Sequence, residues 1–237
     1  MNASRESRTL TIEGDLVRLQ TTTVDREVRT ADFLREIARL HPLDTDILPR
    51  NCAWYARREN PEHRLVGVYA IERPAGPQAV RFNDYKGGSV PVESKTLTLS
   101  WPNTVWFVRC VGPAIQDVYP ACTAAPLAVS GAETRLFQIL MPNIYDGGNG
   151  PVCMGDLTVH DGKPLCSRIN DLMAAILDSH WNSDLMPRFG ETGVEGLDDW
   201  AEKSARDPEF HGKIRFPDHP RGTAGGMMDA LLSDLKG

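Results

Sequence analysis

Residues 135–157, RLFQILMPNIYDGGNGPVCMGDL, join an apolar run to a segment rich in Gly and Pro. The apolar run at 135–140 predicts a β-strand. From 141 to 157, the glycines and prolines exclude a long helix or strand, yet Ile, Tyr, Val, Met and Leu residues can anchor the segment to a core. A structured loop with buried anchors is the kind of segment that holds functional groups.

Further strands are expected on the N-terminal side of this stretch. Apolar, alternating or β-branched runs predict strands at 65–71, 78–83, 96–101 and 104–111. Because short turns rich in Gly and Pro separate these runs, they indicate an antiparallel meander. Nearer the N-terminus, residues 16–20 form a candidate strand, and Thr30 can cap a helix that runs to about Leu40.

On the C-terminal side, a helix is expected to begin at Ser167. Its apolar positions follow the spacing of one helical face, at Ile169, Leu172, Met173, Ile176, Leu177 and His180. From Pro187 onward, Gly, Pro and charged residues surround a few large aromatic residues, which suggests a loop-rich extension packed on the domain, ending in a short helix at 227–235. The element order is that of an α+β protein, with an N-terminal tail or strand at 1–29, a domain at 30–186 and an extension at 187–237.

Composition excludes some classes of protein. The chain has 26 Lys and Arg against 32 Asp and Glu, a net charge of −6, which argues against a nucleic-acid partner. No apolar stretch approaches the ~18 residues of a membrane-spanning helix, and the polar N-terminus lacks a signal region, so a cytoplasmic protein is expected. The five cysteines are an odd number without a C-x-x-C pair, so no disulfide framework is expected.

Cys153 is the best candidate nucleophile. It follows a glycine-rich turn, and glycines allow another polypeptide to approach closely. The alternative is a buried apolar cysteine, which is the common state of a free thiol in proteins. The residues alone leave both interpretations open.

The segment resembles the active-site region of ubiquitin-conjugating enzymes, which have His-Pro-Asn-Ile, a glycine turn and then the catalytic cysteine. This chain has Met-Pro-Asn-Ile-Tyr at 141–145, a glycine turn, and Val-Cys-Met at 152–154. It is still more similar to prokaryotic members of that fold, including the protein-B family of the plasmid-borne PRTRC system. The motifs that carry this similarity are Leu-Ser-Trp-Pro at 99–102 and Asn143 followed by Cys-Met-Gly at 153–155.

The resemblance covers roughly residues 95–185 and implies a ubiquitin-conjugating-enzyme-like fold, an antiparallel β-meander flanked by helices. The chain also departs from the eukaryotic pattern. Met141 replaces the histidine, the spacing from Asn143 to Cys153 is slightly longer, and no Trp lies between Cys153 and the following helix. The extension at 187–237 stands where eukaryotic enzymes have outer helices. These departures bear on partner-binding surfaces and leave the nucleophile and the asparagine in place.

The resemblance implies that Cys153 accepts a ubiquitin-like protein from an activating enzyme as a thioester, and passes it to an amine of a protein substrate. Asn143 would stabilise the oxyanion or hold the loop that frames it, and its alternative is a purely structural Asx-turn residue. Asp146 and Asp156 are candidates to orient or deprotonate the amine. No cofactor, metal or membrane partner is expected. Relatives encoded in the operons called Bil act in antiphage defence, beside genes for such partners.

Two other functions compete with this one. A catalytically silent protein of the same fold would bind a ubiquitin-like protein or scaffold its activating enzyme. A cysteine hydrolase would pair Cys153 with His160, although the Asp-Gly that follows His160 indicates an exposed turn.

Overall fold

The computed structural model describes residues 8–13, 16–21, 25–29, 48–60, 64–84, 93–155, 157 and 162–233. The chain divides into two compact units, Met1–Ile47 and Leu48–Gly237. The first unit contains an antiparallel sheet in the order β1 (Arg8–Glu13), β2 (Leu16–Thr21), β3 (Asp25–Arg29). The strand expected at 16–20 is therefore confirmed as β2. The helix expected from Thr30 to Leu40 lies outside the described residues.

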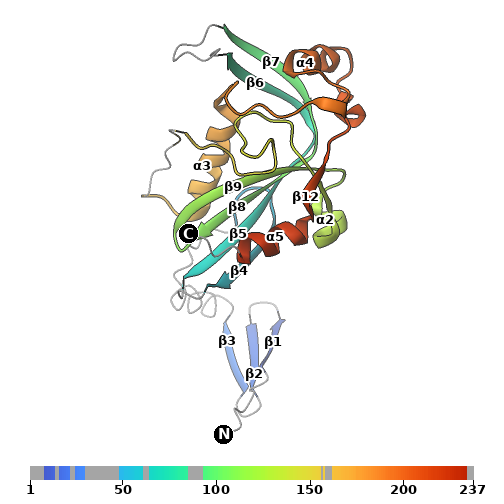
Figure 1. Ribbon diagram of the computed structural model, residues 1–237. Helices are drawn as coiled ribbons and strands as arrows, with labels where there is room; N and C mark the ends of the chain where they lie inside the picture. The colour runs from blue at the N-terminus through green and yellow to red at the C-terminus, as the bar shows by residue number, and fades with distance from the viewer. Residues whose placement is uncertain are drawn as a thin grey trace. The chain divides into compact units, whose positions relative to one another are not determined.

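Two sheets form the frame of the second unit (Figure 1). The six-stranded sheet has the order β12-β10-β9-β8-β5-β4, and the three-stranded sheet has the order β11-β6-β7. All pairs are antiparallel except β11 with β6. The strands are β4 (Cys52–Glu59), β5 (Leu65–Arg73), β6 (Gly76–Asp84), β7 (Glu93–Trp101), β8 (Thr104–Val111), β9 (Ala114–Thr123), β10 (Arg135–Phe137), β11 (His180–Asn182) and β12 (Asp218–Thr223).

One long hairpin links the two sheets. The pairing of β5 with β8 ends at Arg73 and Thr104, and the pairing of β6 with β7 resumes at Gly76 and Trp101. Each arm has a proline in the gap, and a proline cannot donate to a strand ladder. The side chain of Asn103 bridges the gap by accepting a 2.9 Å hydrogen bond from the backbone N–H of Ala75. The antiparallel sheet therefore curls at this break.

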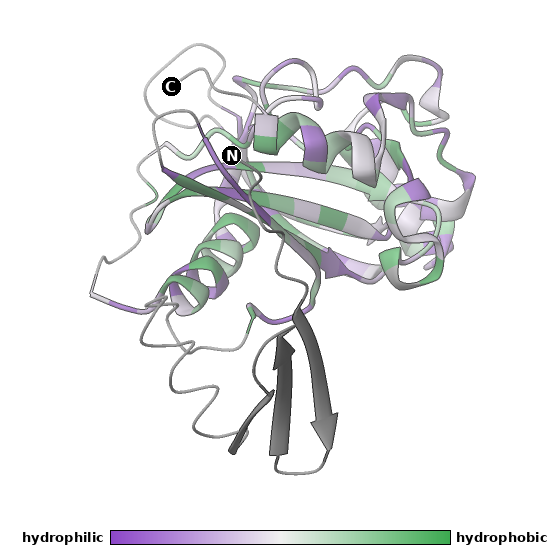
Figure 2. Cartoon of the chain, turned by 90° about the horizontal axis from the view of Figure 1, so that it is seen from below, coloured by the Kyte–Doolittle hydropathy of each residue, from purple (hydrophilic) through white to green (hydrophobic). Residues whose placement is uncertain are grey.

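Helices cover both faces of the six-stranded sheet. Because strand side chains alternate, Val68 of β5 packs in one core with Leu231 of α5 (Ala224–Ser233), whereas Tyr69 packs in the other core with Leu172 of α3 (Leu165–Asp178). Figure 2 shows α3 and α5 on opposite sides of the sheet. The short helical segments are α2 (Leu127–Ser130), η1 (Gly131–Glu133), η2 (Gly190–Thr192) and η3 (Phe210–Lys213).

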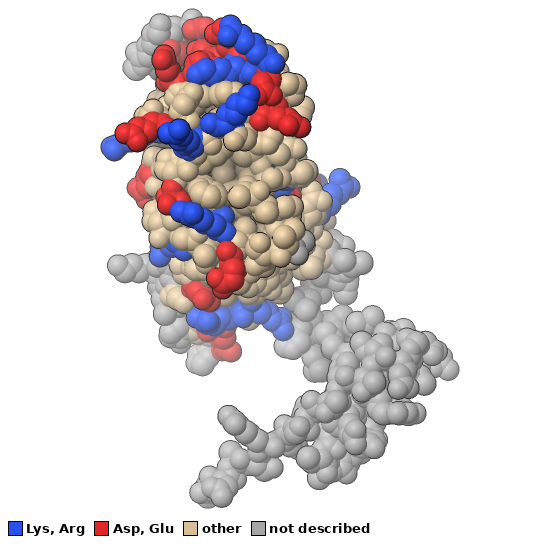
Figure 3. Space-filling view, turned by 90° about the vertical axis from the view of Figure 1, so that its right-hand side faces the viewer, with Lys and Arg blue, Asp and Glu red and all other residues tan. Residues whose placement is uncertain are grey.

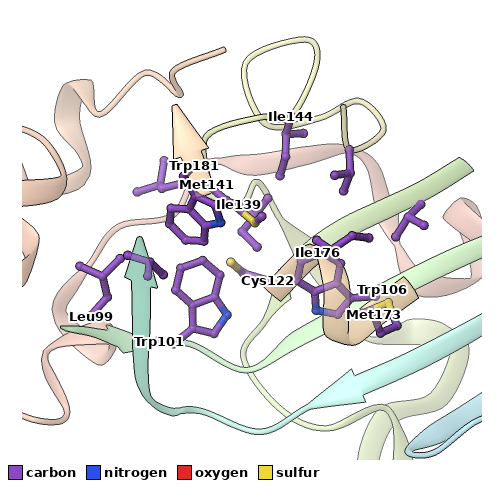
Figure 4. Packing of buried hydrophobic residues seen from close by; sticks show 14 of the residues in the cluster. Leu99, Trp101, Trp106, Cys122, Ile139, Met141, Ile144, Met173, Ile176 and Trp181 are labelled. Atoms are coloured by element: carbon purple, nitrogen blue, oxygen red, sulfur yellow. The ribbon is translucent and has the colours of Figure 1, made fainter. Parts of the chain in front are cut away.

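The helix expected from Ser167 needs correction at both ends. It begins at Leu165, directly after Pro164 at the N-cap, and it ends at Asp178. His180, which was expected on its apolar face, lies in β11 beside β6 instead. Trp181 of β11 is fully buried and packs 5.5 Å, between ring centroids, from Trp101 of β7 (Figure 4).

Helix α4 (Leu197–Arg206) of the C-terminal segment packs along β7. Trp200 stacks on Trp101 with ring centroids 5.6 Å apart, and its Nε1 donates to the Ser100 carbonyl oxygen at 3.2 Å. The Ser100 N–H in turn donates to the Ser204 hydroxyl at 2.8 Å. Side chains of α4 therefore form hydrogen bonds with backbone groups of Ser100 in β7, the edge strand of the three-stranded sheet.

The described part of the chain is a mixed α/β structure with a curled antiparallel sheet and a few helices. None of its helices is long and apolar enough to cross a membrane. On the face beside α4 and α2, acidic and basic side chains are interspersed around a central area without charge (Figure 3).

Candidate active site

The loop at 143–153 closes on itself like a small hairpin. The Cys153 N–H donates to the Asn143 carbonyl oxygen at 2.7 Å, and the Tyr145 N–H donates to the Pro151 carbonyl oxygen at 3.0 Å. Ile144 and Val152 pair between these bonds and are buried, with 1% and 5% of their surface exposed. The expected anchors are confirmed at Ile144 and Val152, which hold Cys153 at the end of the loop, whereas Tyr145 is 46% exposed and is not one of them.

Two glycines at the tip have no room for a side chain. A Cβ on Gly148 would clash with the carbonyl oxygen of Ile139, and the φ of this glycine is +103°. A Cβ on Gly150 would lie 2.9 Å from both the Cβ and the carbonyl oxygen of Tyr145. The glycine turn that the sequence shows is therefore required by close packing of the loop.

Cys153 is half-buried at the edge of an open cavity of about 450 Å³. The Tyr145 hydroxyl donates to its sulfur at 3.4 Å. This hydrogen bond, and the negative charge of the ionised thiol, raise the pKa of Tyr145. The cavity is lined by Asn143, Cys153, Met154, Gly155, Leu157, Ser179, His180, Asn182, Asp184 and Leu185.

The other cysteines lie in less reactive surroundings. Burial raises the pKa of Cys52 to about 11 and that of Cys110 to about 12, and it also raises the pKa of the fully buried Cys122. Cys166 is buried at the start of α3. Cys52 lines a cavity of its own, but its raised pKa leaves little thiolate at neutral pH.

Asn143 connects the loop to β11. Its φ of +62° is a left-handed conformation that Asn tolerates better than most residues. Its Nδ2 donates to the His180 carbonyl oxygen and its Oδ1 accepts from the Asn182 N–H, both at 3.3 Å. The side-chain amide thus makes the two backbone hydrogen bonds that a neighbouring strand would otherwise make with β11. These contacts match the loop-holding role among those considered for Asn143.

Of the acidic and histidine candidates, the structure describes only Asp146. Asp146 is exposed and lines another cavity, of about 890 Å³, formed with residues of the C-terminal segment. Asp156 and His160 lie outside the described residues. Among the described residues, Asp184 and His180 line the cavity of Cys153.

Three residues near Cys153 escaped the sequence analysis: Tyr145, whose hydroxyl contacts the thiol, and the cavity-lining His180 and Asp184. Tyr145 could have been found from its place in the same motif as Asn143. No local signal indicates His180 or Asp184, because their place beside Cys153 depends on the parallel pairing of β11 with β6. Across the described ranges, no three His, Cys, Asp or Glu residues gather as metal ligands.

Comparisons of the chain with protein-family models, curated proteins and solved structures found no match. The function proposed below therefore depends on the geometry of the site and on the motif at 141–154.

Proposed function

We propose that this protein is a conjugating enzyme, which carries a ubiquitin-like protein as a thioester on Cys153 and transfers it to an amine of a protein substrate. We further propose that its second unit has a ubiquitin-conjugating-enzyme-like fold. The observation that carries the proposal is the position of Cys153. Its thiol lies at the mouth of a cavity, at the end of a loop closed by the bond between Cys153 and Asn143.

The first step is a thioester exchange. The Cys153 thiolate attacks the carbonyl carbon of the thioester between the ubiquitin-like protein and its activating enzyme. The new carbon–sulfur bond forms on Cys153 as the thiolate of the activating enzyme leaves. The Tyr145 hydroxyl supports this step because it donates a hydrogen bond to the sulfur, where the negative charge of the attacking group resides.

The second step is aminolysis. A substrate amine enters the cavity and attacks the thioester carbon, and the carbon–sulfur bond to Cys153 breaks as the amide forms. The Asp184 carboxylate on the cavity wall attracts the incoming ammonium group and can receive the proton that the amine loses. Asn143 acts as a positioning residue, since its amide keeps the cysteine loop against β11.

A reconstituted conjugation reaction tests the proposal. The purified chain is incubated with ATP, a ubiquitin-like protein and an activating enzyme that charges it. Cys153→Ala should abolish conjugates on lysine, while Cys52→Ala, which removes another cavity-lining thiol, should retain them. Conjugation by a folded Cys153→Ala variant would overturn the assignment. Binding of the ubiquitin-like protein without a thioester would favour the silent scaffold.

A further inference from the structure

His180 presents an imidazole to the cavity that contains Cys153. Its neighbour Trp181 is 1% exposed and points into the core against Trp101 (Figure 4). Because side chains alternate along a strand, His180 and Asn182 project from the opposite side of β11. Both residues line the cavity, and His180 is exposed. The imidazole therefore faces the space that a substrate of the thioester must enter.

The backbone under His180 is fixed on both sides. On one side, His180 pairs in register with Arg81 of β6. On the other, its carbonyl oxygen accepts the 3.3 Å hydrogen bond from Asn143, the residue whose own carbonyl oxygen binds the Cys153 N–H. A single residue thus connects the backbones that carry the imidazole and the thiol. A catalytic group is most effective on such a rigid support.

The imidazole of His180 does not form a hydrogen bond with the Cys153 thiol in the described part of the chain. Within the described residues, the hydrogen-bond partner of the Cys153 sulfur is the Tyr145 hydroxyl, and no hydrogen bond or ion pair engages the His180 ring. The charged and titratable groups around His180 are Arg81 from β6, Asp178 at the end of α3, Asp184 after β11, and Cys153 with Tyr145 from the loop. Arg81 is itself held by the Asp178 carbonyl oxygen at 2.9 Å.

We propose that His180 is a general base that allows the Cys153 thioester to be transferred to hydroxyl groups as well as to amines. This inference rests on the proposed function. The imidazole takes the proton of the attacking hydroxyl as its oxygen bonds to the thioester carbon. The carbon–sulfur bond then breaks, the Cys153 thiolate leaves, and it recovers the proton from the imidazolium. An oxygen ester and a free thiol are the products.

Attack by a hydroxyl group depends on a general base more than attack by an amine does. A neutral amine is already a good nucleophile and can lose its proton after attack. An alcohol becomes comparably reactive only when a base removes its proton during attack, and a positioned histidine typically accelerates such a step by about a hundredfold or more. A cavity that served lysine alone would have no need of a second, uncommitted base beside Asp184.

A discharge experiment tests the role of His180. The chain is loaded with a synthetic peptide that ends in Gly-Gly and carries an exchangeable C-terminal thioester. The loaded protein is then mixed with Nα-acetyl-lysine amide or with Nα-acetyl-threonine amide, whose only nucleophile is its hydroxyl. The wild type should discharge to both.

His180→Gln keeps a polar side chain but removes the base. It should slow discharge to threonine by about a hundredfold and leave discharge to lysine within about twofold. Asp184→Asn should slow discharge to lysine and leave discharge to threonine unchanged. Asp146→Asn, which alters the other cavity, should change neither rate. An unchanged rate of Cys153 alkylation by iodoacetamide shows that each variant retains the site.

The outcomes separate the two proposals. If no thioester forms on Cys153, the proposed function and the role of His180 both fail. If the thioester forms and discharges to lysine but never to threonine, the proposed function stands and the role of His180 is wrong. Equal discharge to threonine by wild type and His180→Gln would also overturn it.

Discussion

The hydroxyl of Tyr145 lies 3.4 Å from the sulfur of Cys153 and donates a hydrogen bond to it. The two residues come from opposite arms of one closed loop, whose arms are paired at Ile144 and Val152. The loop geometry therefore gives the thiol a fixed donor, and the pKa of the tyrosine is raised because its proton is shared with the sulfur and its anion would face a thiolate. This relationship can be tested by titration.

Cys153→Ala should lower the pKa of Tyr145 toward the ordinary value for tyrosine. Without the sulfur, the phenol loses both the acceptor that retains its proton and the neighbouring negative charge. Tyrosinate absorbance near 295 nm should then appear at lower pH than in the wild type. Subtracting the titration of Tyr145→Phe isolates this residue from the other four tyrosines. Coincident curves for wild type and Cys153→Ala would show that the hydrogen bond is absent.

Asn143→Ala should destabilise the protein by about 2–4 kcal/mol. The substitution removes two hydrogen bonds to β11, each worth about 0.5–1.5 kcal/mol, and leaves alanine in a left-handed conformation that costs roughly 1 kcal/mol. Asn143→Gly removes the same bonds without the conformational cost, so it should recover about 1 kcal/mol in urea unfolding. A loss of less than 0.5 kcal/mol, on the scale of one weak hydrogen bond, would contradict the loop-holding role.

Asp184→Asn should slow transfer to lysine by about fivefold without slowing thioester formation. This is the effect of losing a charge interaction of roughly 1 kcal/mol across a solvated cavity. Single-turnover discharge of the preloaded enzyme measures it. Asp146→Asn is the matched control, because Asp146 is also an exposed carboxylate near the loop but lines the other cavity. The assignment fails if Asp146→Asn has the larger effect.

Gly148→Ala should disrupt the loop far more than Gly147→Ala. Both glycines have positive φ, but only at Gly148 would a Cβ collide with a backbone carbonyl, that of Ile139. We expect Gly148→Ala to cost about 3 kcal/mol or more and Gly147→Ala about 1 kcal/mol. Thermal unfolding compares the two variants. Equal costs would mean that the loop tip can move away from Ile139.

Much of the fold could be predicted from local patterns. The strands at 65–71, 78–83, 96–101 and 104–111 fall within β5, β6, β7 and β8, because their side chains alternate or are largely apolar. The strand β9 was missed because Pro120 interrupts its pattern. The structure accommodates this proline, since β10 pairs with β9 only at Cys122 and Thr123, beyond the missing N–H.

The candidate site could be predicted only in part. Asn143 and Cys153 belong to one short motif, so the sequence brings them together. His180 and Asp184 depend on β11, a strand of three residues that continues the helical spacing of α3 and pairs with a distant strand. Local periodicity cannot reveal such a pairing. The spacing of apolar residues therefore predicted, wrongly, that His180 belongs to the helix.

The most direct test of the central claim is to look for a thioester on Cys153. The protein is incubated with ATP and with the activating enzyme and ubiquitin-like protein that the proposed function requires, and the products are separated on non-reducing gels and weighed by mass spectrometry. We predict an adduct that dithiothreitol removes, and that becomes resistant to dithiothreitol when Cys153→Ser forms an oxygen ester instead. An activating enzyme that is fully charged, beside a chain that never acquires the adduct, would contradict the account.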